Sequence, residues 1–170
     1  MKLISDYYKR QNELLHISPE KYGQRGHRHL GKVDELRRRY KCETILDYGA
    51  GTGELSKKAP FKVENYDPGV PEFEELPEPA DLIVCTDVLE HIEVELLDNV
   101  LTHIEGLMGK VGWFVIATRP DTSKTLPDGT NPHKIIKDHA WWTLELDKYF
   151  NVTSSENVQD REVKCIVLKR

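Results

Sequence analysis

The sequence has few of the features that mark secreted, membrane-spanning or disulfide-stabilised proteins. Its three cysteines, Cys42, Cys85 and Cys165, are an odd number without CxxC spacing, so neither a disulfide framework nor a cysteine zinc site is expected. No apolar run approaches the roughly 20 residues that span a bilayer, and the first ten residues contain no apolar signal-peptide segment. These absences favour a cytoplasmic protein that is not inserted in a membrane.

Basic residues are scarce in one part of the chain and abundant in another. Residues 61–105 contain 13 acidic residues and a single lysine, whereas residues 1–60 contain 13 basic and 8 acidic residues. The net charge is −5, and a domain that binds duplex DNA is ordinarily basic overall, so duplex DNA is not an expected partner. Length and composition predict one domain over residues 1–170, with a helical cap (1–41) and an α/β core (42–170).

The most informative motif is Ile-Leu-Asp-Tyr-Gly-Ala-Gly-Thr-Gly at residues 45–53. It predicts a buried strand that ends at Asp47, a tight glycine turn, and a helix from Glu54. Such a unit forms a cradle for nucleotide-like ligands. The dinucleotide fingerprint is GxGxxG, but this run is GxGxG, and Glu54 at the sixth position would repel a pyrophosphate. Dinucleotide binding and a turn without a ligand are the alternatives.

This motif resembles motif I of the class I methyltransferases, which bind S-adenosylmethionine (SAM). The resemblance implies a Rossmann-like fold and a site for the methionine part of SAM at the turn. The residues that it assigns to the cofactor in this stretch are Asp47, Gly49, Ala50, Gly51 and Gly53.

A second acid, Asp67, ends the next predicted strand at 62–66. In a doubly wound sheet an acid at this position binds the ribose hydroxyls; the alternative is a turn-forming Asp before Pro68. Only 13 residues separate Asp67 from Asp81, too few for the helix–strand–helix of a full class I fold. We therefore expect the third strand to be absent. The sheet should have about six strands, mostly parallel, with an antiparallel C-terminal strand.

The segment Asp87-Val-Leu-Glu90-His91 follows a predicted central strand at 81–85. It therefore lies at the lip of the ligand crevice of an open α/β sheet. The segment resembles the "VLEH" sequence of small-molecule SAM methyltransferases, which implies that Asp87 lies beside the cofactor and that Glu90 and His91 face the reacting centre. It matches neither the Asn/Asp-Pro-Pro-aromatic motif of amino-methylating DNA enzymes nor the Pro-Cys nucleophile of cytosine-C5 enzymes.

Two histidines are candidates for a general base, His91 and His133, the latter on a long loop at 119–137. Histidine has a pKa near working pH; a purely structural histidine is the alternative for each. We expect no metal. As an alternative, the pattern D-x-x-E-H with a distant His resembles the metal site of small-RNA 3′-terminal 2′-O-methyltransferases. That resemblance implies an ion held by Asp87, Glu90, His91 and His133.

Two arginines are candidates for binding the acceptor. Arg25 lies in a basic loop flanked by Gly23 and Gly26, and Arg119 directly follows the strand predicted at 113–118. Guanidinium groups bind carboxylates and phosphates, so either residue could hold an anionic acceptor. A solvated surface arginine is the alternative for both.

The remaining elements are predicted from periodicity and turn residues. A helix from 92 to 107 is expected to end at Gly109 and Gly112, and Asp138 is an expected N-cap of a helix whose Trp141 and Trp142 enter the core. A hairpin of strands at about 150–154 and 162–168 should close the chain.

The N-terminal residues 3–16 predict a helix that covers the crevice. Its inward-facing residues are predicted to be Tyr7, Leu14 and Leu15. Three tyrosines are expected to wall the SAM pocket from this side: Tyr7, Tyr8 and Tyr22.

The whole chain resembles small methyltransferases encoded by bacteriophages, in the segments 11–16, 22–26, 46–53, 128–133 and 141–142. The implied function is SAM-dependent methyl transfer to an oxygen or nitrogen of a small molecule or of a nucleotide or RNA end. Two alternatives stay open. One is a protein that cleaves SAM or binds it for regulation, and the other is a nucleotide-binding interaction module that uses the basic N-terminal region.

Overall fold

The computed structural model describes residues 1–16 and 23–170. Within this part of the chain, six strands form one sheet in the order β2-β1-β3-β4-β6-β5. All neighbouring pairs from β2 to β4 are parallel, and β6 is antiparallel to both β4 and β5. The strands are β1 (Ile45–Tyr48), β2 (Glu64–Tyr66), β3 (Ala80–Thr86), β4 (Met108–Ala117), β5 (Asn151–Val158) and β6 (Glu162–Leu168). The expected mostly parallel α/β sheet is confirmed.

The third strand of a full class I sheet is missing, as its short sequence predicts. The structure describes every residue between β2 and β3, and this segment contains a single 3₁₀ turn, η2 (Pro71–Phe73), and no strand. The turn is held by the N–H of Asp67, which donates to the Phe73 carbonyl at 2.9 Å. As a result, β2 is an edge strand, and a loop takes the place of the missing strand and helix.

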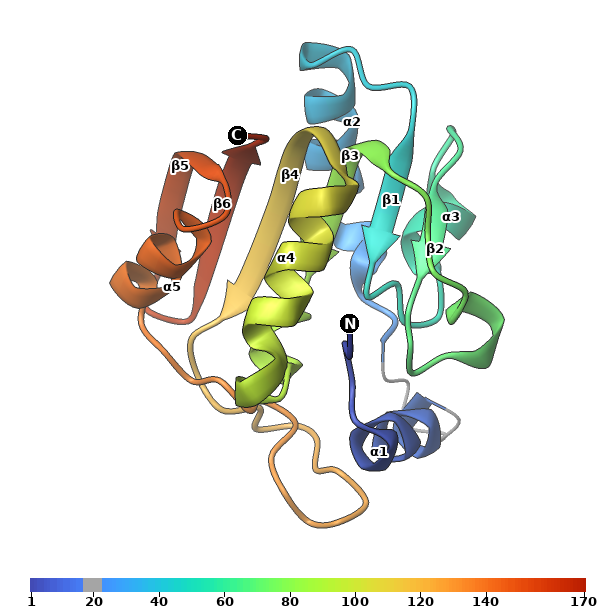
Figure 1. Ribbon diagram of the computed structural model, residues 1–170, viewed down its shortest axis with the longest axis vertical. Coiled ribbons are helices and arrows are strands. Elements are labelled where there is room, and N and C mark those ends of the chain that lie inside the picture. The colour runs from blue at the N-terminus through green and yellow to red at the C-terminus, as the bar shows by residue number, and fades with distance from the viewer. Residues whose placement is uncertain (17–22) are drawn as a thin grey trace.

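Helices cover both faces of the sheet, so the crevice at the strand ends is built on a rigid support. On one face, α2 (Leu30–Arg39) and α3 (Glu54–Lys58) bury Val33, Leu36 and Leu55 against the strands. On the other face, α4 (Leu97–Leu107) and α5 (His139–Leu146) form the larger core, in which Trp142 is fully buried. Figure 1 shows α4 crossing in front of the sheet and α2 behind it.

Two boundaries differ from the sequence prediction, and at the first of them two glycines were misinterpreted. The strand expected at 113–118 begins at Met108, so Gly109 and Gly112 lie inside β4 instead of ending a helix. A Cβ on Gly112 would lie 2.7 Å from Met108 Cε and 2.9 Å from Val167 Cγ2. This glycine therefore makes room for neighbouring side chains within the sheet. The preceding helix begins only at Leu97, after two 3₁₀ turns, η3 (Leu89–His91) and η4 (Val94–Leu96).

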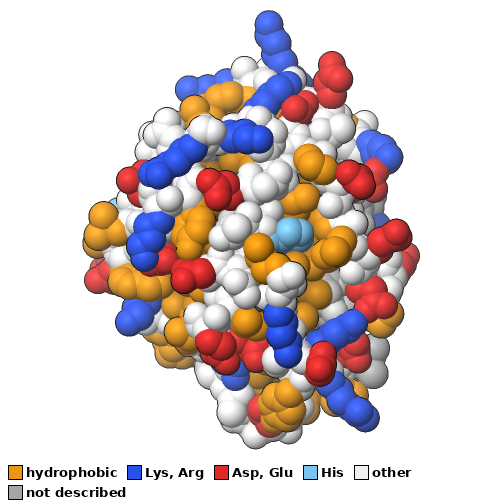
Figure 2. Space-filling model, in the orientation of Figure 1, with side chains coloured by type: hydrophobic (Ala, Val, Ile, Leu, Met, Phe, Trp, Pro, Cys, Tyr) orange, Lys and Arg blue, Asp and Glu red, His pale blue; other side chains and the backbone are white. Residues whose placement is uncertain are grey.

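The face that carries α4 has charges of both signs interspersed over it, with apolar atoms between them (Figure 2). No helix among the described residues combines the length and the hydropathy that a membrane span needs.

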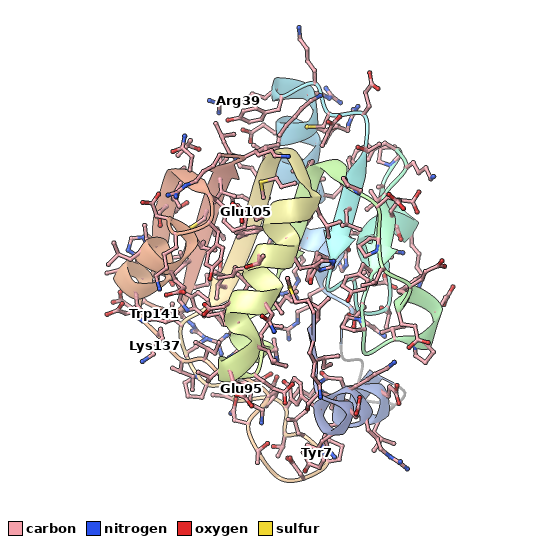
Figure 3. All side chains as sticks on the ribbon, viewed as in Figure 1. Tyr7, Arg39, Glu95, Glu105, Lys137 and Trp141 are labelled. Carbon is pink, nitrogen blue, oxygen red and sulfur yellow. The ribbon has the colours of Figure 1, made fainter. Side chains whose placement is uncertain are left out.

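Helix α1 (Asp6–His16) lies beyond the carboxyl ends of the parallel strands, beside the loop 119–137 (Figure 1). It has a small core of its own, in which Tyr8 and Leu15 pack on Leu126. The prediction for Tyr7 and Leu14 is wrong, because they are 62% and 44% exposed. Figure 3 shows Tyr7 at the end of the molecule opposite to α2.

Polar contacts attach α1 to the rest of the molecule. Ser5 donates from its N–H and its hydroxyl to the Glu93 carboxylate, at 2.8 and 2.6 Å. Lys9 pairs with Glu74, and the Tyr8 hydroxyl donates to the Pro132 carbonyl at 3.2 Å. Helix α1 is therefore the part of the expected cap that lies over the crevice, whereas α2 packs on the sheet.

Candidate active site

A cavity of about 650 Å³ lies at the carboxyl ends of β1, β3 and β4. This volume is within the range of small-molecule sites, and the location is where open α/β sheets bind their ligands. Ten of the predicted site residues line the cavity: Arg25, Asp47, Gly49, Ala50, Gly51, Asp67, Asp87, His91, Arg119 and His133. Of the tyrosines expected to wall it, Tyr8 does so, and Tyr22 is outside the described residues.

The glycine turn needs glycine for two separate reasons. Gly49, Gly51 and Gly53 have φ values of +83°, +54° and +73°, a region that side chains disfavour. A Cβ on Gly49 would lie 2.3 Å from Val88 Cγ2, and one on Gly51 would lie 2.5 Å from the Gly23 carbonyl oxygen. The turn thus packs against two other loops of the crevice. Gly53 is the N-cap of α3 and is not part of the cavity lining.

All five peptide N–H groups of the turn 49–53 donate to acceptors within the protein. The first two donate to the Tyr66 carbonyl at 2.7 and 3.1 Å, and the third donates to the Asp67 carboxylate at 2.8 Å. The last two donate to the carbonyls of Gly23 and Ala50. A pyrophosphate site offers such N–H groups to the ligand, so this turn disfavours the dinucleotide alternative.

Asp47, at the end of β1, is a buried carboxyl group in the cavity wall. It is 3% exposed. Burial raises its pKa from 3.8 to about 7, and the negative charge of Asp67 adds to the shift. A cationic ligand group beside Asp47 would offset the cost of ionising it.

Asp67 ends β2 and shapes two neighbouring turns. Its two carboxylate oxygens accept N–H groups of Gly51 at 2.8 Å and Gly69 at 2.9 Å. A carboxylate can accept about four hydrogen bonds, so these contacts are compatible with further donors from a ligand. All three residues line the cavity.

Asp87 has an unusual backbone conformation, with φ of +55°. Such strain in a residue other than glycine gathers at functional sites, and the N–H of Asp87 is held by the Val115 carbonyl at 2.9 Å. The carboxylate is accessible from the cavity, but surrounding groups displace much of its water and raise its pKa. The charges of His29 and Arg25 oppose that shift.

Glu90 lies behind the cavity wall and is fully buried. Its Oε1 accepts the N–H of Ala117 at 2.9 Å, whereas its Oε2 has no hydrogen-bond partner. Burial, followed by the charge of Asp87, raises its pKa well above the usual range. A buried oxygen without a donor is costly, and such groups often have a functional reason.

The two candidate bases meet although 41 residues separate them in sequence. The rings of His91 and His133 are 4.7 Å apart, edge to face at 87°. Nδ1 of His91 lies 3.2 Å from the Pro132 carbonyl, and Nδ1 of His133 lies 2.6 Å from the Arg119 carbonyl. A carbonyl only accepts, so each Nδ1 carries the proton and each Nε2 is the basic nitrogen.

Three of the four residues of the metal alternative are close enough to share an ion. Glu90, His91 and His133 each offer one ligand atom, and these atoms lie within 4.8 Å of one another. Asp87 is not part of this group. The metal alternative is therefore corrected to these three residues.

Four further charged residues line the cavity: Arg28, His29, Arg161 and Lys164. Sequence reasoning pointed to the first two only as members of a basic loop, and it missed the last two. The first two belong to η1 (Gly26–His29), within the basic loop already noted. The last two carry no local signal. They reach the cavity because β6 pairs with β4, which places the β5–β6 turn beside Thr118.

Comparison with known proteins agrees with this fold. A model of a family described as a methyltransferase domain matches residues 14–160. No sequence among the curated proteins matches the chain.

Solved structures show the same fold at low identity. One is a 1,6-didemethyltoxoflavin-N1-methyltransferase from Burkholderia thailandensis with its named substrate and S-adenosylhomocysteine (SAH) bound. It has a TM-score of 0.64 and 14% identity. The match covers 99% of this chain and 92% of the toxoflavin enzyme's chain. The DhpI–SAH complex has a TM-score of 0.58 and 17% identity. The match covers 95% of this chain and 92% of the DhpI chain. An O-methyltransferase family protein from Burkholderia thailandensis has a TM-score of 0.56 and 14% identity. This chain aligns over 86% of its length but spans only 57% of that protein.

Proposed function

The chain belongs to the methyltransferase domain family and is a SAM-dependent methyltransferase, and we propose that it methylates an oxygen or nitrogen of a small molecule or of a nucleotide or RNA end. The observation that carries this proposal is the composition of one cavity. Its lining brings together acidic residues, the glycine turn and two histidines.

We assign the cofactor to the side of the cavity formed by β1 and β2. The buried Asp47 carboxylate fits the ammonium group of SAM, because a cation there relieves the cost of its ionisation. Asp67 receives the ribose hydroxyls, and the turn 49–53 packs against the methionine part, since its N–H groups are already bonded. When bound, SAM supplies an activated methyl group.

His133 and His91 are proposed to accept the proton of the acceptor. When bound, SAM would supply the methyl group and leave as SAH, and Nε2 of one of these histidines would take the proton that the acceptor loses. The carbonyls of Arg119 and Pro132 hold each ring in the tautomer that this requires. An oxygen of Glu90 lies within 4.8 Å of a nitrogen of each ring, where an ionised carboxylate would stabilise the imidazolium that forms.

A divalent metal is a second candidate for activating the acceptor. The observation that favours it is the convergence of Glu90, His91 and His133, together with the unpartnered Glu90 oxygen. Backbone carbonyls on both Nδ1 atoms are the arrangement that orients histidine ligands, and the mixed oxygen and nitrogen donors suit Zn²⁺ or Mn²⁺. Such an ion would polarise an acceptor hydroxyl.

The two modes of activation are separated by chelation. Protein treated with a chelator should retain methyl transfer if the histidines act as bases alone, and lose it until Mn²⁺ or Zn²⁺ is returned if the metal is required. Glu90→Gln removes the charge of a ligand while keeping its size. It should weaken metal binding about tenfold or more, as measured by calorimetry.

The proposed function is tested by titrating the protein with SAM and SAH and then supplying methyl-labelled SAM with pools of nucleosides and small hydroxylated or amino compounds. Transfer of label into an acceptor is expected. Steady release of methylthioadenosine or homoserine lactone without an acceptor would instead support SAM cleavage. Binding of neither SAM nor SAH would overturn the assignment of the cavity.

A further inference from the structure

Four arginines line the cavity from three separate parts of the chain. Arg25 precedes η1 and Arg28 lies within it, Arg119 follows β4, and Arg161 lies in the turn between β5 and β6. Together we call them the arginine rim. The last two are neighbours in the fold, because the N–H of Thr118 donates to the Arg161 carbonyl at 3.0 Å.

The rim arginines have no carboxylate partner among the described residues. No ion pair joins any of their four guanidinium groups to a described acid, and Arg119 Nε is buried without a hydrogen-bond partner. Arginines elsewhere on the surface differ, since Arg37 and Arg38 both pair with Asp34. The rim is therefore not neutralised within the described protein.

Two of the three acids near the rim are engaged with other residues. Glu162 pairs with Lys164 at 3.0 Å, and Asp121 accepts the N–H and the hydroxyl of Ser123. The third acid, Asp87, is close enough to the rim for the charge of Arg25 to act on its pKa. The lining around the rim nevertheless has more basic than acidic residues, in a chain whose net charge is −5, whereas the face in Figure 2 mixes both signs.

The rim is also placed correctly relative to the candidate base. The Arg119 carbonyl holds Nδ1 of His133 at 2.6 Å, so the residue that begins one side of the rim also orients the ring. A group bound by the Arg119 side chain would bring the rest of the acceptor next to that imidazole.

We propose that the acceptor carries a phosphate group that the arginine rim binds. This inference rests on the proposed methyl transfer and narrows its substrate class. A guanidinium offers a planar fork of donors that matches phosphate oxygens, and four such groups exceed what one carboxylate can use. The source of the phosphate is a mononucleotide, a sugar phosphate or the phosphorylated end of an RNA.

The first test uses inorganic pyrophosphate as a bare probe of the rim. It is titrated by calorimetry into SAH-saturated protein at low ionic strength. Binding should weaken about tenfold in Arg119→Gln and in Arg161→Gln, since hydrogen bonds to charged groups are the strong ones. Arg119→Lys keeps the charge without the fork and should recover only part of the affinity.

The matched control is Arg39→Gln, an exposed arginine at the end of α2 far from α1 (Figure 3). It should bind pyrophosphate as the unaltered protein does. Equal weakening in Arg39→Gln and the rim variants would mean a nonspecific charge effect and would overturn the proposal. Failure of SAH-loaded protein to bind pyrophosphate at all would also overturn it.

The second test compares acceptors that differ only in the phosphate. Methyl transfer is measured with nucleosides and their 5′-monophosphates, with glucose and glucose 6-phosphate, and with an RNA oligonucleotide with and without terminal phosphate. At least one phosphorylated member should be preferred about tenfold or more, and that member identifies the source. Transfer with no phosphate preference would refute this inference and leave methyl transfer intact. Absence of SAH binding would instead refute the proposed function.

Discussion

Asp47→Asn should make the protein without cofactor more stable while weakening cofactor binding. The side chain is 3% exposed, and burial raises its pKa from 3.8 to about 7. Between these two pH values the folded protein keeps a proton that the unfolded chain releases, so the free energy of unfolding falls as pH rises. The full effect has an upper bound of about 4 kcal/mol, because one pKa unit corresponds to about 1.4 kcal/mol.

The assay is urea unfolding of both proteins without SAM, at pH 5 and pH 8. Asparagine has the shape of aspartate but does not titrate. The free energy of unfolding of the Asn variant should therefore exceed that of the unaltered protein by about 3 kcal/mol more at pH 8 than at pH 5, which is the part of the pKa shift that lies above pH 5. Asp34→Asn is the control, since Arg37 and Arg38 lower the pKa of that carboxyl. It should show no gain in stability as pH rises.

Cofactor binding provides the second half of the same prediction. SAM should bind the ionised carboxylate, so its affinity for the unaltered protein should rise with pH up to about 7 and then level off. The Asn variant should bind SAM about tenfold to a hundredfold more weakly and without that rise. An advantage of Asn that is equal at pH 5 and pH 8, or an unchanged SAM affinity, would refute the reasoning about this buried carboxyl.

Three further predictions concern the base, the turn and the core. His133→Asn should lower kcat by about a hundredfold or more with SAH affinity unchanged in calorimetry, and an unaltered kcat would remove this residue from catalysis. Gly51→Ala should weaken SAH binding and accelerate proteolysis of the loop before η1, since its Cβ would lie 2.5 Å from the Gly23 carbonyl; tight binding in this variant would contradict the docking of the two loops. Trp142→Ala should lower the free energy of unfolding by about 3–5 kcal/mol, because Trp142 is fully buried; a loss below 1 kcal/mol by urea unfolding would contradict its place in the core.

The parts of the site that the sequence predicted are those that depend on strand ends. Asp47 lies near the end of β1, and Asp67 and Asp87 directly follow β2 and β3. The carboxyl ends of parallel strands meet at one edge of the sheet. The meeting of His91 and His133 follows from the same rule. The sequence did not predict which strand pairs with β4. Arg161 was therefore missed, because it reaches the cavity through the pairing of β6 with β4.

The wrong predictions have local physical causes. Helix α1 was expected to turn Tyr7 inward, but its partner is the small core around Leu126 and not the sheet. Tyr7 instead donates its hydroxyl to Asp128 at 2.9 Å. Gly112 was interpreted as a helix stop, but its lack of a side chain serves packing across β4 and β6. In both cases a residue distant in sequence determines the local structure, and such a contact cannot be read from a single sequence.

The loss of the third strand also bears on how the protein avoids self-association. An exposed sheet edge is a template for pairing with another chain, and short, charged edges suppress this. Removing the third strand made β2 the border of the sheet, but β2 has only three residues, and Glu64 on it pairs with Lys62. On this side the sheet therefore ends in a short, charged edge, which disfavours pairing with another chain.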